Sequence, residues 1–188
     1  MAKFKIIGGS ITSPQGFLAA SRFCNLKKIG TGKGSNKGEK RDLALIFSEV
    51  PAKAAGMFTT NQICAAPVKI CIKHLKNNSA QAVVVNSGNA NAHTGTHGIK
   101  IINEYVDFLS KKINCKKDQI FVSSTGVIGE IFDPKIIIRQ FKKIENKFET
   151  KLLEAAKAIM TTDTYPKVSV INVSINKTSF KIYESNSL

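Results

Sequence analysis

Residues 121–129, FVSSTGVIG, join a short apolar run to three hydroxyl side chains and a glycine. The run Ile120-Phe121-Val122 is typical of a buried strand, and the chain then changes to small polar residues at 123–126. A strand that ends in such residues leaves backbone N–H groups accessible and lets another group approach closely. Acyl-transfer chemistry requires such a place, because preorganised donors must stabilise an oxyanion. An ordinary strand followed by a polar turn is the alternative interpretation, and small polar loops of that kind are common.

The segments on either side alternate between strands and helices. Apolar runs predict strands at residues 43–48, 66–72 and 82–86 and a strand that runs into a turn at residues 57–61, and the apolar residues between 168 and 182 suggest one more. Apolar residues at a helical period predict a helix over residues 99–113, and residues 151–160 predict another. Asp133-Pro134 is typical of a helix start, with Asp133 as the N-cap. This alternation indicates a layered α/β fold.

Three stretches rich in small residues separate these elements. Residues 51–56 predict a turn or a short helix. Residues 27–41 carry four glycines among lysines but lack the spacing of a phosphate-binding loop, so we interpret them as a flexible basic loop. Residues 87–95, SGNANAHTG, favour αL geometry and local hydrogen bonds, and form either a well-bonded turn or the polar wall of a site.

The composition narrows the function classes. The 188 residues, 43% of them hydrophobic, are enough for one sizeable folded domain. No apolar run approaches the roughly 20 residues of a membrane span, and the N-terminal run lacks the apolar core of a secretory signal. We therefore expect a cytoplasmic protein with no membrane partner. The four cysteines form no CxxC pair and the three histidines give no zinc-finger spacing, so we expect reduced thiols and no metal site.

The net charge of +15 is large enough to suggest a nucleic-acid partner. However, the lysines are scattered over most of the chain, and arginine, the better reader of phosphates and bases, occurs only at positions 22, 41 and 139. We interpret the charge as a lysine-rich solvated surface and expect no nucleic-acid partner. A basic nucleic-acid-binding module is the alternative hypothesis, which a salt titration of binding would test.

Five stretches of unusual composition follow one another along the chain. They are GGSITSPQGF, AGMFTTNQICAAPV, AVVVNSGNANAHTG, VSSTGVIG and AIMTTDTYPK. In order and approximate spacing they resemble the ornithine acetyltransferase family, also called bifunctional glutamate N-acetyltransferases, from about Gly8 to Val173. The resemblance implies the layered α/β sandwich of that family, with residues 1–188 as a single domain that makes up most of its α portion.

The resemblance also implies an activity and partners. Family members cleave themselves into α and β chains, and the new N-terminal threonine of the β chain takes an acetyl group from N-acetylornithine and passes it to glutamate in arginine biosynthesis. The freed α-amine serves as the base for that hydroxyl, and one acyl-enzyme shared by two substrates implies ping-pong kinetics without a cofactor. The expected partners are the two substrates and the β portion, in a heterodimer or a higher oligomer such as a heterotetramer.

Individual residues match the family's functional positions. Thr125 and Gly126 match its oxyanion-hole pair, Thr125 through the hydroxyl and Gly126 through the backbone N–H. The substrate-binding threonine falls among Thr161, Thr162 and Thr164, and Thr162 or Thr164 is preferred. Three asparagines of the neighbouring loop either shape the site or stabilise the loop, namely Asn86, Asn89 and Asn91.

The sequence departs from the family after its last predicted strand. Family α chains continue into a Lys-Gly-Ser-Gly-Met-Ile-type segment that supplies a substrate-binding lysine and leads to the cleavage point before the nucleophile. Residues 178–188 contain no such segment, so we expect the nucleophile and the β portion to be absent. The chain is then a truncated, frameshifted or split gene product, or an inactive remnant. Whether acetyl-coenzyme A is also accepted stays open.

Overall fold

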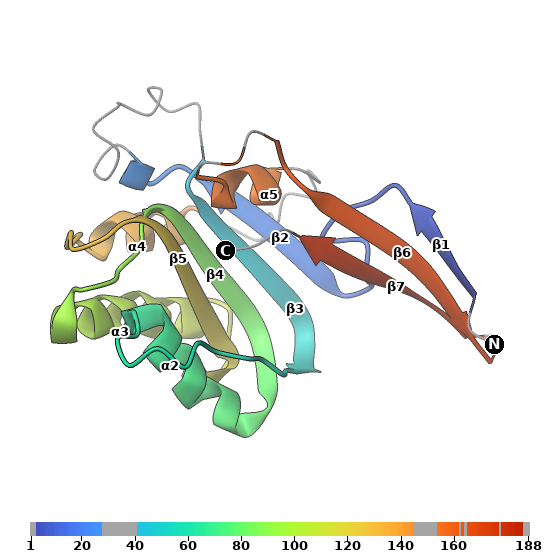
Figure 1. Ribbon diagram of the computed structural model, residues 1–188, viewed down its shortest axis with the longest axis horizontal. Helices are drawn as coiled ribbons and strands as arrows, with labels where there is room; N and C mark the ends of the chain where they lie inside the picture. Colours follow the sequence, from blue (N-terminus) through green and yellow to red (C-terminus); the bar gives the residue numbers. More distant parts are fainter. Residues whose placement is uncertain are drawn as a thin grey trace.

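The computed structural model describes residues 3–27, 41–144, 154–161, 163, 165–176 and 178–185, which form two β-sheets and their covering helices (Figure 1). An antiparallel three-stranded sheet has the order β1-β6-β7, and a mixed four-stranded sheet has the order β2-β3-β4-β5. The predicted α/β class is therefore confirmed. Within these ranges, no helix combines the length and the apolar character needed to span a membrane.

The bounds of the elements are as follows. The first sheet consists of β1 (Lys3–Ile7), β6 (Val168–Ile175) and β7 (Thr178–Ser185). The second consists of β2 (Phe17–Arg22), β3 (Leu43–Lys53), β4 (Ser79–Asn89) and β5 (Ile120–Val127). The helices are α2 (Ala66–His74), α3 (Gly95–Lys112), α4 (Lys135–Lys142) and α5 (Glu154–Ile159), with short 3-10 turns at Leu75–Asn77 and Lys117–Gln119.

Helices pack on both faces of the four-stranded sheet. α2 and α3 pack on β5 and α4 packs on α3, whereas α5 packs on β2, β3 and β4 (Figure 1). The main core lies on the α2–α4 side and includes the fully buried Leu45, Ile102, Tyr105, Ile120 and Phe141. A second cluster joins α5 to the other face through Ala19, Ala44, Val85, Ala155 and Ala158. Because these side chains are small, α5 lies close to the sheet.

Several predicted elements are wrong. Residues 66–72, predicted as a strand, form α2, in which Pro67 suits the first turn and the buried residues Ala66, Ile70 and His74 repeat at helical spacing. Residues 57–61, predicted as a strand that runs into a turn, contain no strand. Residues 51–53, predicted as part of a turn or short helix, extend β3, because after an irregularity in register that strand pairs again with the start of β4. The predicted basic loop at 27–41 falls almost wholly outside the described residues.

Two strands continue further than their apolar runs predict. β5 extends through Val127 and β4 through Asn89, because the two strands pair in parallel over the small polar residues at their ends. The predicted turn at residues 123–126 is therefore part of the sheet. The predicted helix start at Asp133 is one residue early, since Pro134 is the N-cap, although Asp133 Oδ1 still accepts the Lys135 N–H at 2.9 Å.

Candidate active site

The carboxyl ends of β4 and β5 form the candidate site. In the parallel register, Ser87 lies beside Thr125 and Gly88 lies beside Gly126. α3 carries the chain from the end of β4 back to the start of β5, so both ends meet at the same edge of the sheet. The fold thus joins the polar end of FVSSTG to the polar loop after VVVN, two stretches that lie about forty residues apart in the sequence.

Gly126 and Gly88 allow an unusually close approach of backbone segments. Both have a positive φ, +133° at Gly126 and +106° at Gly88, and residues that carry a Cβ rarely adopt such a backbone angle. A Cβ on Gly126 would overlap the backbone of Gly88 and Asn89, and a Cβ on Gly88 would overlap the backbone of Lys27. Three backbone segments are therefore stacked here, and glycine is required at both strand positions.

The hydroxyl groups around these glycines differ in their use. Ser124 donates to Asn86 Oδ1 at 2.6 Å, and Ser87 donates to the Ala158 carbonyl of α5 at 2.5 Å. Alternation along the strands puts Ser123 and Thr125 on the same face as Ser87, the face on which α5 packs. In the part of the chain that the structure describes, neither the Ser123 nor the Thr125 hydroxyl has a hydrogen-bond partner. Thr125 is half-buried, and its hydroxyl is available as a donor.

The three predicted asparagines are buried, and their hydrogen bonds both close the loop and join it to neighbouring segments. Asn86 Nδ2 donates to the Asn89 carbonyl at 2.8 Å, and Asn89 Nδ2 donates to the Glu130 carbonyl at 3.0 Å. Asn91, at φ +48°, donates through Nδ2 to the Gly98 carbonyl at 3.1 Å. The Asn89 and Asn91 side-chain oxygens also accept bonds from within the loop and the start of α3. Of the two interpretations, stabilisation of the loop is the one that these contacts support.

Sequence reasoning did not identify Asp42, a buried carboxylate that binds backbone N–H groups beside the candidate site. Asp42 is fully buried, and its Oδ1 accepts the Cys24 N–H at 2.5 Å while Oδ2 accepts the Leu26 N–H at 2.6 Å. Its backbone carbonyl accepts the Ser87 N–H at 2.8 Å, which ties it to β4. Burial raises the pKa of the Asp42 carboxyl, and the backbone N–H bonds and the nearby Lys27 oppose that rise. The only sequence signal was an aspartate directly before an apolar strand.

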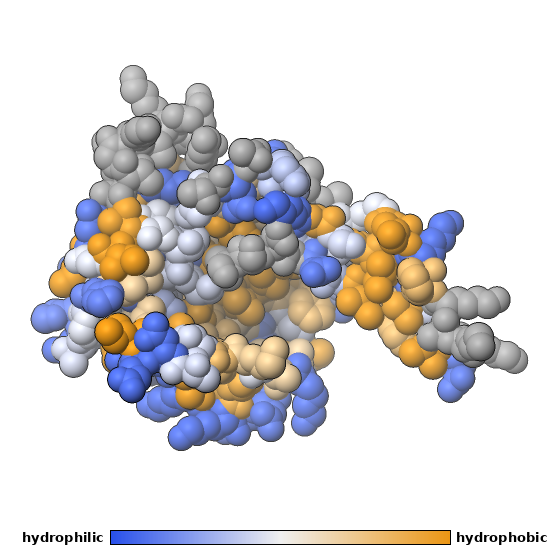
Figure 2. Space-filling view, viewed as in Figure 1, coloured by the Kyte–Doolittle hydropathy of each residue, from blue (hydrophilic) through white to orange (hydrophobic). Residues whose placement is uncertain are grey.

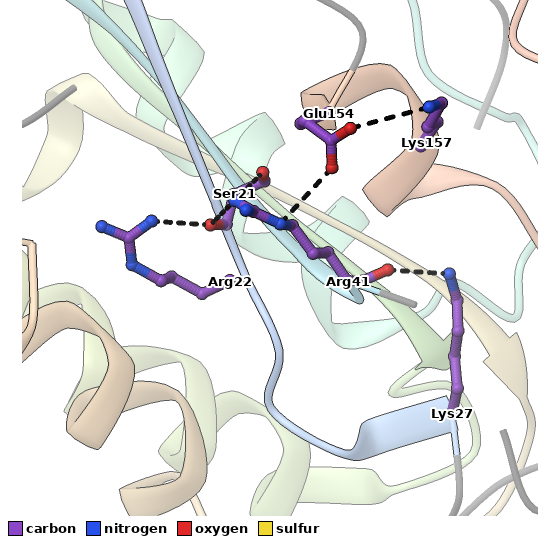
Figure 3. A network of polar contacts seen from close by, with 6 residues as sticks. All are labelled: Ser21, Arg22, Lys27, Arg41, Glu154 and Lys157. Atoms are coloured by element: carbon purple, nitrogen blue, oxygen red, sulfur yellow. Dashed lines mark hydrogen bonds and ion pairs between the residues drawn. The ribbon is translucent and has the colours of Figure 1, made fainter. Parts of the chain in front are cut away.

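A polar network holds α5 against this end of the sheet (Figure 3). Arg41 donates through Nη1 to the Ser21 carbonyl at 2.8 Å and forms an ion pair with Glu154 at 3.4 Å. The buried Lys27 donates through Nζ to the Arg41 carbonyl at 3.0 Å and contacts the Ala158 carbonyl at 3.5 Å. Both Lys27 and Ser87 thus bind the carbonyl of Ala158. They fix the C-terminal end of α5 at Ser87, which lies beside Thr125 in the sheet.

The predicted substrate-binding threonines come directly after α5. Thr161 is exposed and lies three residues beyond Ala158, whereas Thr162 and Thr164 lie outside the described residues. Asp163 forms an ion pair with Lys167 at 3.0 Å. No group of three or more His, Cys, Asp or Glu side chains within the described ranges is arranged to hold a metal ion.

The fold and the site together define an α/β protein with potential oxyanion donors at the end of a parallel strand pair. Comparison with known proteins is more specific: residues 28–185 match the ArgJ family, and the chain belongs to that family. It is 45% identical over 148 residues to the arginine biosynthesis bifunctional protein ArgJ of Brucella suis, covering 78% of this chain and 36% of the relative. The corresponding Staphylococcus epidermidis protein is 39% identical over 168 residues, covering 89% of this chain and 39% of the relative.

Solved structures of relatives have the same fold. The Bacillus halodurans ArgJ crystal structure gives a TM-score of 0.87 at 28% identity, and the match covers 98% of this chain and 93% of that one. The Mycobacterium tuberculosis ornithine acetyltransferase, crystallised with ornithine, gives a TM-score of 0.82 at 28% identity, covering 98% and 94%. The layered fold expected from the resemblance is therefore confirmed. The chain spans less than half the length of the curated relatives.

Proposed function

We propose that this chain forms part of an enzyme that transfers the acetyl group of N-acetylornithine to glutamate in arginine biosynthesis. Membership of the ArgJ family supports the proposal, because the relatives are named as arginine biosynthesis proteins. The Mycobacterium tuberculosis relative is an ornithine acetyltransferase crystallised with ornithine. Ornithine is the amine that N-acetylornithine releases when it gives up its acetyl group, which favours N-acetylornithine as the donor.

The position of Thr125 beside Gly126 is the observation that carries this proposal. Thr125 is half-buried and its hydroxyl has no partner among the described residues, whereas neighbouring Ser87 and Ser124 use their hydroxyls in structural bonds. Gly126 is exposed and has no side chain to shield its backbone. A hydroxyl and a backbone N–H held at a strand end are the preorganised donors that a developing oxyanion requires. We assign the oxyanion hole to these two groups.

The proposed chemistry divides between this chain and the part of the ArgJ protein that it does not match, here called the complementary portion. A threonine hydroxyl of the complementary portion attacks the acetyl carbonyl, and its proton passes through the α-amine of that threonine to the departing ornithine amine. The glutamate amine then attacks the acetyl ester, giving N-acetylglutamate and restoring the hydroxyl. In both tetrahedral intermediates the negative oxygen would lie against Thr125 and Gly126, so the scheme needs no cofactor.

The remaining assignments follow the same scheme. One of Thr161, Thr162 and Thr164 would bind substrate, because α5, which ends just before them, is anchored to Ser87 beside Thr125. We propose a heterodimer with the complementary portion, the β portion of the family, which associates further into an assembly such as a heterotetramer. We place the protein in the cytoplasm, where the thiols of its four free cysteines would stay reduced.

The test is to co-express the chain with the complementary portion of the Staphylococcus epidermidis relative and to measure N-acetylglutamate formation by mass spectrometry. The complex should convert N-acetylornithine and glutamate with ping-pong kinetics, and the chain alone should not. A complex whose nucleophilic threonine is replaced by alanine gives the background rate. Turnover by the isolated chain, abolished by a point mutation within it, would contradict this division of roles. A folded complex without turnover would contradict the activity itself.

A further inference from the structure

Two rows of apolar side chains cross one face of the three-stranded sheet. Directly opposed residues of antiparallel strands carry their side chains on the same side of the sheet. One row consists of Phe4, Val173 and Phe180, and the next consists of Ile6, Ile171 and Ile182. Each of the three strands thus contributes one residue to each row, and the rows form a continuous surface, here called the apolar face.

The other face of the same sheet has a different character. Lys5, Asn172 and Lys181 form a polar row across the three strands, between the two apolar rows in sequence but on the opposite side. The neighbouring row on that side contains Val170, which is buried. That row also contains Ile7 and Tyr183. Apart from it, the alternation along β1 and β7 specifies one polar face and one apolar face, as in a sheet that is covered on one side.

The apolar face is exposed in this chain. Phe4 and Ile6 are 75% and 72% exposed, and Phe180 and Ile182 are 41% and 48% exposed. In Figure 2, apolar side chains gather over β1 and β6. The described helices pack on the four-stranded sheet instead. Scattered single apolar residues are normal on a protein surface, whereas a contiguous patch of large ones marks an interaction site.

We propose that the apolar face binds the complementary portion of the ArgJ protein. The curated relatives that this chain matches are more than twice as long as the matched span, which covers 36% of one and 39% of the other. The solved chains of relatives nevertheless correspond to nearly this whole fold and to little else, at 93% and 94% coverage. In the relatives, therefore, most of the protein lies outside this fold. That remaining part is the occupant that we propose for the apolar face.

The charge of the chain disfavours a second copy as the occupant. Each copy carries a formal net charge of +15, so two copies repel each other when they approach. The identity of the occupant rests on the proposed function, whereas the face itself rests on the register and exposure of its residues.

A matched pair of photo-cross-linking variants tests the proposal. p-Benzoylphenylalanine replaces Phe180 in one variant and Lys181 in the other, which puts the same probe on opposite faces of β7 at adjacent, exposed positions. Each variant is co-expressed with the complementary portion of the Staphylococcus epidermidis relative and irradiated. Position 180 should cross-link to the complementary portion and position 181 should not. Equal cross-linking at both positions, cross-linking of 180 to a second copy, or no association of the folded chain would each overturn the proposal.

A binding measurement on substituted chains gives an independent check. Phe4→Ser combined with Ile6→Ser should weaken association at least about tenfold, because two large apolar side chains lose their burial. The control Lys5→Ser lies between them on the opposite face and should leave the affinity unchanged. Circular dichroism verifies that each variant is folded, and unchanged affinity of the folded double variant overturns the proposal.

Acetyl transfer measured on the same complexes separates the proposed function from the proposed binding face. Cross-linking without turnover contradicts only the proposed function. Turnover without cross-linking at position 180 contradicts only the binding at the apolar face.

Discussion

Gly126 lies beside Gly88 in the parallel register of β4 and β5, and a methyl group on either would overlap neighbouring backbone. This close contact draws the carboxyl ends of the two strands together and brings the backbone of Lys27 against them. The half-buried residue Thr125 is positioned by the same contact, since it precedes Gly126 on β5. The candidate oxyanion site therefore depends on two glycines that come from different motifs of the sequence.

Replacing either glycine should lower stability. Gly126→Ala and Gly88→Ala should each reduce the free energy of unfolding by about 1–3 kcal/mol or more, from the positive φ alone, with the backbone overlap in addition. Urea denaturation monitored by circular dichroism measures the change. Gly8→Ala is the matched control, since a Cβ there has no atom within 4 Å, and it should change stability little. A Gly126→Ala chain as stable as the original would show that the close backbone approach does not exist.

Replacing Thr125 tests the oxyanion hole directly. In an active complex with the complementary portion, Thr125→Ala should slow acetyl transfer by about a hundred- to a thousand-fold, the usual effect of losing one oxyanion donor. The effect should fall mainly on kcat, because the donor acts where charge develops. Thr125→Ser retains the hydroxyl and should keep much of the activity. An unchanged rate for a folded Thr125→Ala enzyme would assign Thr125 a structural role instead.

The bond between Ser87 and Ala158 should control the local stability of the end of α5. Ser87→Ala removes a donor to the Ala158 carbonyl and should cost about 0.5–1.5 kcal/mol. Hydrogen exchange of the backbone amides from 159 to 161 should become faster, because the end of the helix loses one of its two anchors. Ser123→Ala is the control: it lies on the same face of the sheet, and its hydroxyl has no partner in the described ranges. Equal exchange in the two variants would contradict the anchoring role.

Asp107 should make stability fall at acid pH. Hydrogen bonds from Lys111 and Lys117 lower the pKa of its carboxyl from 3.8 to about 2. A carboxyl whose pKa is lower in the folded state contributes its stabilisation above the unfolded value, and that contribution is lost as the pH falls from about 4 to about 2. The contribution should be small and salt-sensitive, because Asp107 is on the surface. An NMR titration of the Asp107 carboxyl measures the midpoint, and a midpoint near 3.8 would contradict the prediction.

The sequence predicted well where one local rule sufficed. The alternation of strands and helices gave the α/β class, and helical spacing located α3 within a few residues. It failed at residues 66–72, because a short apolar run that begins with Ala-Pro suits either a strand or the first turns of a helix. Only the packing of Ile70, Cys71 and His74 against the sheet distinguishes the two, and that packing involves residues distant in sequence.

The sequence by itself determined which residues carry the candidate chemistry, because Thr125, Gly126 and the threonines after α5 lie in motifs that are recognisable one at a time. The alternation of Phe180 and Ile182 with the polar Ser179 and Lys181 along β7 is likewise a local property of the sequence. Only the tertiary structure decided that Gly88 lies beside Gly126 and that Ser87 and Lys27 bind the end of α5. The same is true of the bond between the buried Asp42 carboxylate and the Cys24 backbone N–H. These contacts join segments up to 131 residues apart, and no local pattern encodes such a distance. Burial and strand register establish these contacts, and both arise only when the whole sheet has formed.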